Sequence, residues 1–355
     1  AAELLRLGAD NAMVSTVFFR KVSRARLKLE SMIYSGLQYF RDGKIAVATI
    51  TLEMMEKAGY RKEYAAAITA ASAIIGPIIP PSGIMIIYAV CAANVSISDM
   101  FLGGIGPGVL LGICEMALCY YFAVKHKHPR REKRTPVRDV LVVFWDSLPA
   151  LGMPLIIMGG ITTGIFTATE SSAIAVFYAL IVAFCKKQIT WKSLVECCLN
   201  TAKTTANTMF IIAVATAMSY AITILRIPQE IVSVVMENVH SPYVFLLITN
   251  IILIILGCVL DQSPALLMMV PILLPIATQF GIDPVHFGVL CCFNLTIGLI
   301  SPPVGMTLFV TANVAKVKLT ALFKEVIPFV VLGYATLFLI TYVPQIVTFI
   351  PNLLK

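Results

Sequence analysis

The chain has 355 residues, of which 59% are hydrophobic and only 13% are charged, and its mean hydropathy is +0.89. A soluble core of this size does not need so much apolar material, so the composition excludes an ordinary soluble domain and predicts an all-α, polytopic membrane protein. The net charge of +8 does not indicate nucleic-acid binding, because the basic residues gather in short connectors between apolar segments, where they set membrane orientation.

The sequence lacks the residue patterns that catalysis or transition-metal binding would need. The nine cysteines show no CxxC or Cys/His ligand spacing, and the adjacent pairs Cys197–Cys198 and Cys291–Cys292 lie in apolar surroundings that favour packing. The four histidines do not cluster with carboxylates, and the sequence contains no P-loop, nucleophile elbow or zinc motif. We therefore expect that the protein is not an enzyme.

The front of the chain is mixed in composition and only moderately apolar. Residues 1–30 are basic and predict a solvated or membrane-surface helix. Residues 29–55 carry a polar stretch at 38–44 between two moderately apolar arms, and positive charge flanks them on both sides. Because positive charge marks the cytoplasmic face, this segment is predicted to be a re-entrant hairpin that opens to the cytoplasm.

Residues 63–95 are predicted to cross the membrane outward as a helix that is broken at Pro80 and Pro81, inside the motif GPIIPPSG at 76–83. Neither proline can donate a helix hydrogen bond, and the residue before them is pushed out of the helical region. In hydrocarbon a freed backbone group is costly, so unwound chain is stable there only when protein buries it or when it lines a polar cavity.

The middle of the chain holds the continuous spans. Residues 101–124 form the clearest one, and it ends in the strongest cytoplasmic marker, a run of lysines and arginines between Lys125 and Arg138. Beyond it we predict further spans and one interfacial helix anchored by Trp191, followed by a mixed outer segment: spans 148–166, 171–185 and 204–225, helix 190–200, and outer segment 226–241.

The last third repeats the order of the first. Residues 243–279 read as two apolar arms around the polar tip 261–264, and this hairpin is predicted to open outward because its flanks lack basic charge. Residues 285–315 then cross inward through a second proline pair, in SPPVG at 301–305, and residues 326–350 form the last predicted span.

An internal repeat follows from these positions. Pro302 lies 222 positions after Pro80 (302 − 80), and Phe323 lies equally far after Phe101 (323 − 101). The two broken helices cross in opposite directions, and inverted repeats with paired broken helices are typical of alternating-access secondary transporters. We accordingly divide the chain into a first repeat, connecting spans with scaffold helices, and a second repeat: 1–100, 101–225 and 226–355.

Several motifs resemble the large membrane subunit of the tripartite ATP-independent periplasmic (TRAP) transporters, from about Ile50 to the C-terminus: GPIIPPSGIMIIYAV, LDQSPALLMMVPILLPIA at 260–277 and NLTIGLISPPVGMTLFV at 294–310. The closing PQIVTFIPNLL at 344–354 is similar to the sialic-acid members. The resemblance implies sodium-driven uptake of an organic acid, sialic acid or a C4-dicarboxylate, through a bacterial inner-membrane permease of the elevator type. It also implies two partners, a periplasmic substrate-binding protein and a small (Q-type) membrane subunit.

The sequence departs from that family at its front. The family has further apolar spans there, and its first hairpin carries a serine- and glycine-rich tip. This chain keeps Ser35 and Gly36 but places Arg41 and Lys44 nearby, and each charge would cost roughly 2.5–3.5 kcal/mol at membrane depth. We expect a truncated or frame-shifted, inactive product; a genuine variant site is the alternative.

Two candidate half-sites follow, one at each break. In the second, the hairpin tip is expected to face the unwound stretch 298–303, where backbone carbonyls and a hydroxyl would bind sodium. The substrate-binding candidates are Ser82, Asp261, Gln262, Ser263, Pro302 and Pro303. The sodium-binding candidates are Ser35, Gly36, Gly76, Pro80, Asp261, Gly298 and Ser301. The alternatives are a tight turn capped by Asp261 and, at the first break, a simple kink.

Four further polar residues stand out in apolar surroundings. Glu170 is interpreted as a gate or, preferably, as a cap of the next helix. Glu115 is an intramembrane acid, either functional or bonded across a helix interface. His286 and Asn294 flank the second broken helix, as functional groups, caps or interhelical hydrogen-bonding groups.

Two other functions stay open on the sequence alone. One is a stand-alone sodium/anion symporter of similar architecture, which would need no binding protein. The other is a structural or assembly subunit without transport activity, which the altered first hairpin favours.

Overall fold

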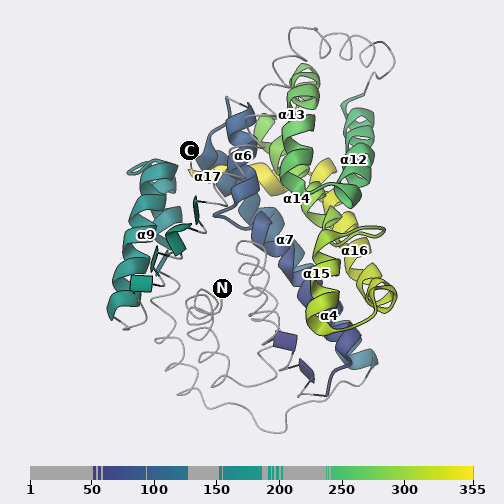
Figure 1. The fold of residues 1–355 in the computed structure, drawn as a ribbon. Helices are drawn as coiled ribbons and strands as arrows, with labels where there is room; N and C mark the ends of the chain where they lie inside the picture. Colours follow the sequence, from purple (N-terminus) through teal and green to yellow (C-terminus); the bar gives the residue numbers. More distant parts are fainter. Residues whose placement is uncertain are drawn as a thin grey trace.

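In the computed structural model, the part of the chain described comprises residues 51–52, 55–56, 59–92, 94–126, 152–153, 155–185, 191–192, 194–195, 197–199, 201–202, 237, 239 and 241–354. These residues form helices and turns, without a strand among them (Figure 1). Five of the helical segments are long and apolar enough to cross a membrane. The all-α prediction is confirmed, and the chain is a polytopic membrane protein. The predicted first hairpin with Ser35 and Gly36, the basic run after Lys125 and the span 204–225 lie outside the described residues, entirely or nearly so.

The first Pro-Pro pair interrupts its helix as predicted. Helix α4 (Lys62–Ala73) continues through the short α5 (Ile75–Ile78), and after a turn α6 (Gly83–Ala92) resumes. Ile79 is extended at φ −79° and ψ 129°, because the ring of the following proline excludes the helical conformation. The Pro80–Pro81 peptide bond is cis.

The second pair does the same between α14 (Pro284–Gly298) and α15 (Met306–Ala315), again with a cis Pro302–Pro303 bond. Helix α14 begins where Asp283 accepts hydrogen bonds from the backbone of Val285 and His286, and Pro284 occupies the first helical position, which needs no donor.

Helices α7 (Ile97–Lys125) and α9 (Ala168–Cys185) lie between these two crossings in the sequence. Helix α7 is longer than the predicted span 101–124. The second hairpin consists of α12 (Pro242–Val259) and α13 (Gln262–Gln279), which meet at Leu260 and Asp261. The two apolar arms and the polar tip are therefore where the sequence predicted them.

The last predicted span was wrong in its bounds. Residues 326–350 are not one helix: α16 (Leu319–Tyr342) begins earlier, and α17 (Gln345–Leu354) follows a break at Val343 and Pro344. Proline 344 lacks the amide that would continue α16. Helix α17 packs against α7, where a Cβ added to Gly106 would lie 2.3 Å from the carbonyl oxygen of Ile346.

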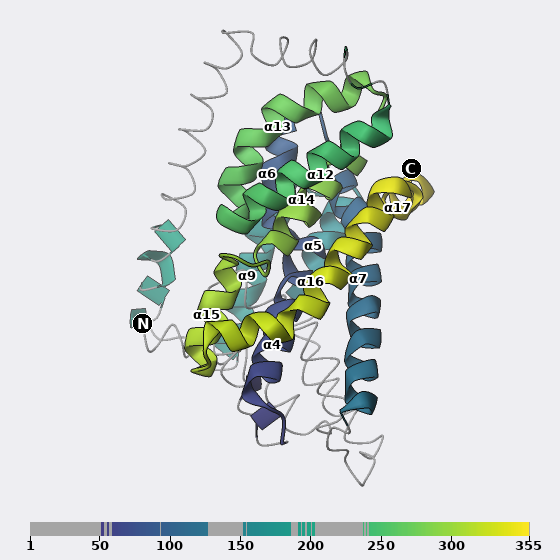
Figure 2. The ribbon, with the colours of Figure 1, turned by 90° about the vertical axis from the view of Figure 1, so that its right-hand side faces the viewer.

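The two broken helices pack side by side and antiparallel. Helix α4, the first half of one, contacts α15, the second half of the other, while α6 contacts α14. Figures 1 and 2 show the same order from two directions, with α6 and α14 above α4 and α15. This is the arrangement that opposed crossings predict; the repeat itself stays a prediction.

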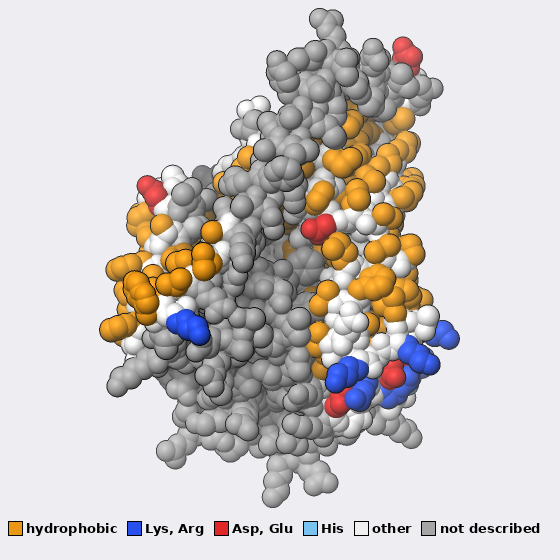
Figure 3. Space-filling model, in the orientation of Figure 1, with side chains coloured by type: hydrophobic (Ala, Val, Ile, Leu, Met, Phe, Trp, Pro, Cys, Tyr) orange, Lys and Arg blue, Asp and Glu red, His pale blue; other side chains and the backbone are white. Residues whose placement is uncertain are grey.

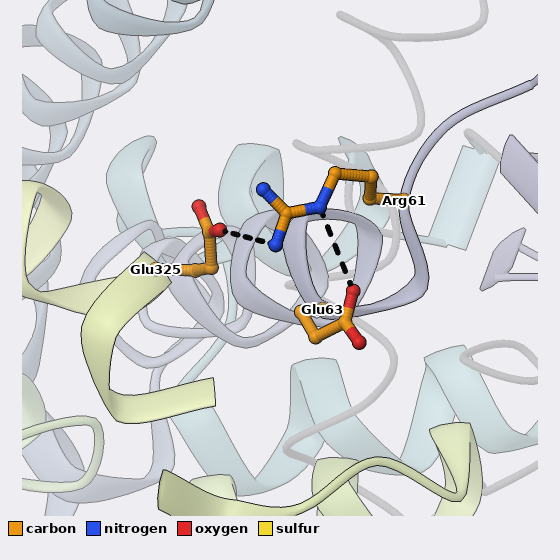
Figure 4. A network of polar contacts seen from close by, with 3 residues as sticks. All are labelled: Arg61, Glu63 and Glu325. Atoms are coloured by element: carbon orange, nitrogen blue, oxygen red, sulfur yellow. Dashed lines mark ion pairs between the residues drawn. The ribbon is translucent and has the colours of Figure 1, made fainter. Parts of the chain in front are cut away.

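The basic helix ends meet at one end of the molecule. Near the start of α4, the Tyr64 ring lies 6.2 Å from that of Phe122 near the end of α7, and Phe122 lies 6.3 Å from Phe329 of α16. Arg61 contacts Glu325 at 3.1 Å and Glu63 at 3.8 Å (Figure 4). Figure 3 shows lysine and arginine side chains gathered at the lower end of these helices, below a surface of hydrophobic side chains. The start of α4, the end of α7 and the start of α16, which the sequence predicted to be cytoplasmic, therefore lie on one face of the molecule.

Candidate functional site

The second break is an unwound stretch that follows the end of α14. The last turn of α14 tightens into three successive short-range bonds, from the amides of Leu299, Ile300 and Ser301 to the carbonyls three residues before. The chain then leaves the helix, and no described residue donates a hydrogen bond to the carbonyl oxygens of Ser301, Pro302 or Pro303. These oxygens are hard ligands of the kind that alkali and alkaline-earth cations prefer.

Glycine at 305 allows the chain to turn back into α15. Gly305 has φ +56°, in the left-handed region that costs an L-residue about 1–2 kcal/mol. Its added Cβ would also lie 3.1 Å from the Ser301 carbonyl oxygen. The amide of Thr307 then reaches back to the Leu299 carbonyl at 3.1 Å, which closes the unwound loop.

Gly298 brings the end of α12 against the end of α14. A Cβ added to Gly298 would lie 2.5 Å from the carbonyl carbon and oxygen of Gly257, so the two backbones are in direct contact. The sequence predicted Gly298 as a sodium ligand; the structure places it at this helix contact. The hairpin arm and the second break are therefore packed together, as the predicted site requires.

Ser301 is buried, with 2% of its surface exposed. Its Oγ donates to the Ile297 carbonyl at 2.9 Å and lies 2.8 Å from the hydroxyl of Tyr334 in α16. Sequence reasoning missed Tyr334, although a phenol among the apolar residues of a membrane span is a signal, since its hydroxyl needs a partner.

The hairpin tip contacts the same helix one turn earlier. Asp261 is exposed and accepts the amide hydrogen of Gln262 at 2.8 Å, so it caps α13. The capped turn, which was the alternative interpretation, is thus present. Gln262 reaches α14, where its Oε1 accepts a hydrogen bond from Thr296 at 3.2 Å. Ser263 is partly buried beside them.

At the first break, the hydroxyl of Ser82 bridges the two helix pieces. Ser82 is 1% exposed; its Oγ donates to the Pro77 carbonyl of α5 and lies 3.4 Å from the Met85 amide of α6. Gly76 and Pro80 are buried in the same place. The predicted partners from the first hairpin tip, Ser35 and Gly36, lie outside the described residues.

The two breaks share one packed core. Helix α6 contacts both α13 and α14, and α5 also contacts α14. The Tyr88 hydroxyl of α6 donates to the Pro284 carbonyl at 2.8 Å, and its ring lies over Gly288, where a Cβ would come within 2.2 Å of it. The first broken helix therefore packs on both the hairpin and the second broken helix.

Glu170 takes part in the cap of α9, but it lies in the first turn of the helix and is not the N-cap residue that the sequence predicted. Its carboxylate accepts from the Thr167 amide at 2.8 Å and from the Thr167 hydroxyl at 2.9 Å, and the Glu170 amide lies 3.3 Å from that hydroxyl. This is a capping box with Thr167 as the cap. Among the described residues, neither oxygen of the buried Glu115 carboxyl has a hydrogen-bond partner, so the bond considered across a helix interface is not found there.

His286 and Asn294 form interhelical hydrogen bonds. His286 Nε2 lies 3.0 Å from the Ile340 carbonyl of α16. Asn294 Nδ2 donates to the carbonyl and to the side-chain oxygen of Asn250 in α12, at 3.1 and 3.0 Å. Asn250 Nδ2 in turn donates a hydrogen bond to the Thr341 hydroxyl in α16 at 2.9 Å. This polar chain links α14, α12 and α16 behind the break.

No three His, Cys, Asp or Glu side chains gather to hold a metal ion anywhere in the part of the chain that the structure describes. What the breaks offer is backbone carbonyls, hydroxyls and one amide side chain. The carbonyl oxygens are hard acceptors, and the hydroxyls and the amide can also donate hydrogen bonds.

A family model described as "Tripartite ATP-independent periplasmic transporter, DctM component" matches residues 43–346. An uncharacterised protein of Salmonella typhimurium is 39% identical over 87% of this chain and 71% of its own length. A sialic acid TRAP transporter permease of Haemophilus influenzae is 39% identical over 86% of this chain, which spans about half (49%) of that relative. A C4-dicarboxylate TRAP transporter large permease of Pseudomonas aeruginosa is 36% identical over 91% of this chain and 76% of its own length.

Proposed function

Because this chain belongs to the DctM-component family of the tripartite ATP-independent periplasmic transporters, we propose that it is a permease that couples sodium entry to the uptake of an organic acid. The observation that carries the proposal is the second break, where the buried Ser301 hydroxyl and carbonyl oxygens to which no described residue donates lie close to the hairpin tip.

Helix polarity supports a cation at this break. Helices α12 and α14 bring their C-terminal ends into contact through Gly257 and Gly298. Each C-terminus carries a partial negative charge of roughly half an elementary charge, and the two add where they meet. Ser301 Oγ and the carbonyls of 301–303 are the oxygen ligands, and the exposed Asp261 supplies negative charge at the tip.

The same geometry supports an acidic solute next to the cation. Helix α15 starts at the break, at Met306, and helix N-termini favour carboxylates, whereas the N-terminus of α13 at the hairpin tip is already capped by Asp261. Gln262 and Ser263 would bind polar groups of the solute, with Pro302 and Pro303 forming its apolar wall and Ser82 serving the first half-site. Relatives named for sialic acid and for C4-dicarboxylates suggest these two classes of acid.

Membership of the family also suggests the membrane location, the partners and the movement of this chain. The chain would lie in the bacterial inner membrane, receive its solute from a periplasmic binding protein and pack beside a small membrane subunit. Movement of the domain that bears the breaks against a scaffold would alternate access, as in other transporters with paired broken helices.

The proposal is tested by uptake in proteoliposomes that contain the complete transporter. We expect Ser301→Ala and Asp261→Ala to abolish sodium-dependent uptake of the labelled acid while leaving membrane insertion unchanged. Thr348→Ala is the control, because the Thr348 hydroxyl bonds to the Pro344 carbonyl at the start of its own helix and to no other described residue. Normal sodium-dependent uptake by both site variants would refute the proposal.

A further inference from the structure

The hydroxyl of Tyr334 lies at the junction of three elements. It is 2.8 Å from Ser301 Oγ in the second break, and the thiol of Cys258 in the last turn of α12 lies beside it. Helix α16 can approach this closely because its Gly333 faces Ile297, where an added Cβ would lie 3.3 Å from the Ile297 side chain.

Either hydroxyl can be the donor in the contact between Ser301 and Tyr334. Ser301 has one hydroxyl proton and two acceptors within reach, the Ile297 carbonyl at 2.9 Å and the Tyr334 oxygen at 2.8 Å. In both arrangements the Tyr334 hydroxyl fixes one of the bonding directions at the Ser301 oxygen.

The consequence concerns the oxygen of Ser301. The contacts with Ile297 and Tyr334 hold the Ser301 side chain in one orientation, so the direction in which its oxygen can accept a further ligand is set by them. A ligand oxygen whose orientation is set before binding loses less entropy when it binds.

We infer that Tyr334 is a positioning residue of the cation site at the second break, which orients the Ser301 oxygen and ties it to the hairpin arm through Cys258. This inference rests on the proposed function. Tyr334 does not itself touch the cation; it acts through Ser301.

The test is binding of radioactive sodium to the purified chain, measured by scintillation proximity at constant ionic strength with potassium as the counter-salt. We expect Tyr334→Phe, which keeps the ring and removes the hydroxyl, to raise the half-saturating sodium concentration about two- to tenfold. Tyr342→Phe is the matched control on the same helix, because its ring packs 6.1 Å from Tyr243, away from the break.

The dependence on Ser301 separates a positioning role from a packing role. In the Ser301→Ala background, Tyr334→Phe should weaken sodium binding no further, whereas a packing defect would add its own effect. Cys258→Ala should weaken binding less than Tyr334→Phe, and Cys258→Ser, which keeps a hydrogen-bonding group of similar size, should bind sodium nearly as the unaltered chain does. The cysteine pair decides the question if Tyr334→Phe fails to fold.

The outcomes distinguish the inference from its premise. If Ser301→Ala weakens sodium binding but Tyr334→Phe and Cys258→Ala bind as the unaltered chain does, the positioning role is refuted and the cation site stands. If the unaltered chain shows no saturable sodium binding, or if Ser301→Ala changes nothing, the proposed function fails and the inference with it.

Discussion

The two Pro-Pro breaks share a motif and differ in what their serines contact. At the first break, Ser82 joins α5 to α6, so the hydroxyl is satisfied within the broken helix itself. At the second, Ser301 contacts Tyr334 of α16, and nearby Thr296 and Gly298 contact the hairpin. The comparison teaches that proline pairs determine where a helix is interrupted, while the neighbouring helices determine what the interruption can bind.

The largest expected difference between the breaks concerns their glycines. Gly298→Ala would place a methyl group 2.5 Å from the Gly257 backbone, which cannot move as a side chain can, and we expect a loss of about 3 kcal/mol in the free energy of unfolding. The matched change is Gly83→Ala at the first break, where an added Cβ meets nothing within 4 Å. Thermal unfolding in detergent should show a lower midpoint for Gly298→Ala alone. Equal midpoints would mean that α12 and α14 are not in backbone contact.

A smaller effect is expected from breaking the hydrogen bonds that join Asn294, Asn250 and Thr341. Asn294→Leu removes two donors from the buried oxygens of Asn250, and we expect a cost of about 2 kcal/mol. Thr336→Val is the control, since Thr336 bonds only to the Leu332 carbonyl within α16. Denaturant unfolding of both variants checks this. A control as unstable as Asn294→Leu would show that the interhelical bonds contribute nothing special.

The smallest effect is expected where the first broken helix meets α16 at the basic end. Arg61 contacts Glu325 at 3.1 Å, but 72% of the arginine side chain is exposed, so solvent and salt screen the pair (Figure 4). We expect Arg61→Ala to cost no more than about 0.5 kcal/mol at low salt and nothing measurable at 1 M salt. Lys318→Ala, on the same face, should change stability equally little at both salt concentrations. A large, salt-independent loss for Arg61→Ala would contradict this account.

Much of the fold could be predicted because its causes are local. Pro80–Pro81 and Pro302–Pro303 remove backbone donors wherever they occur, and the polar tip 261–264 between apolar arms marks a hairpin. The break between α16 and α17 had the same signal in Pro344. The prediction missed it because the apolar composition continues through it, and composition does not distinguish one long helix from two.

The contacts that define the candidate site could not be predicted, because they join residues far apart in the chain. Gly257 with Gly298 and Tyr334 with Ser301 depend on how α12, α14 and α16 pack, and nothing in either local sequence specifies the partner. Asp261 shows the reverse case: the sequence indicated both a ligand and a cap, and the structure shows the cap.

The central claim is that the second break binds a cation. At the first break, by contrast, the Ser82 hydroxyl bridges the two pieces of its own broken helix. The most direct measurement is a pair of high-resolution density maps of the complete transporter, one in sodium chloride and one in potassium chloride. The account predicts a sodium-dependent peak ligated by Ser301 Oγ and by carbonyl oxygens between 298 and 303. Identical maps with no peak at the second break, or a peak that is ligated elsewhere while these oxygens bond only to protein, would contradict it.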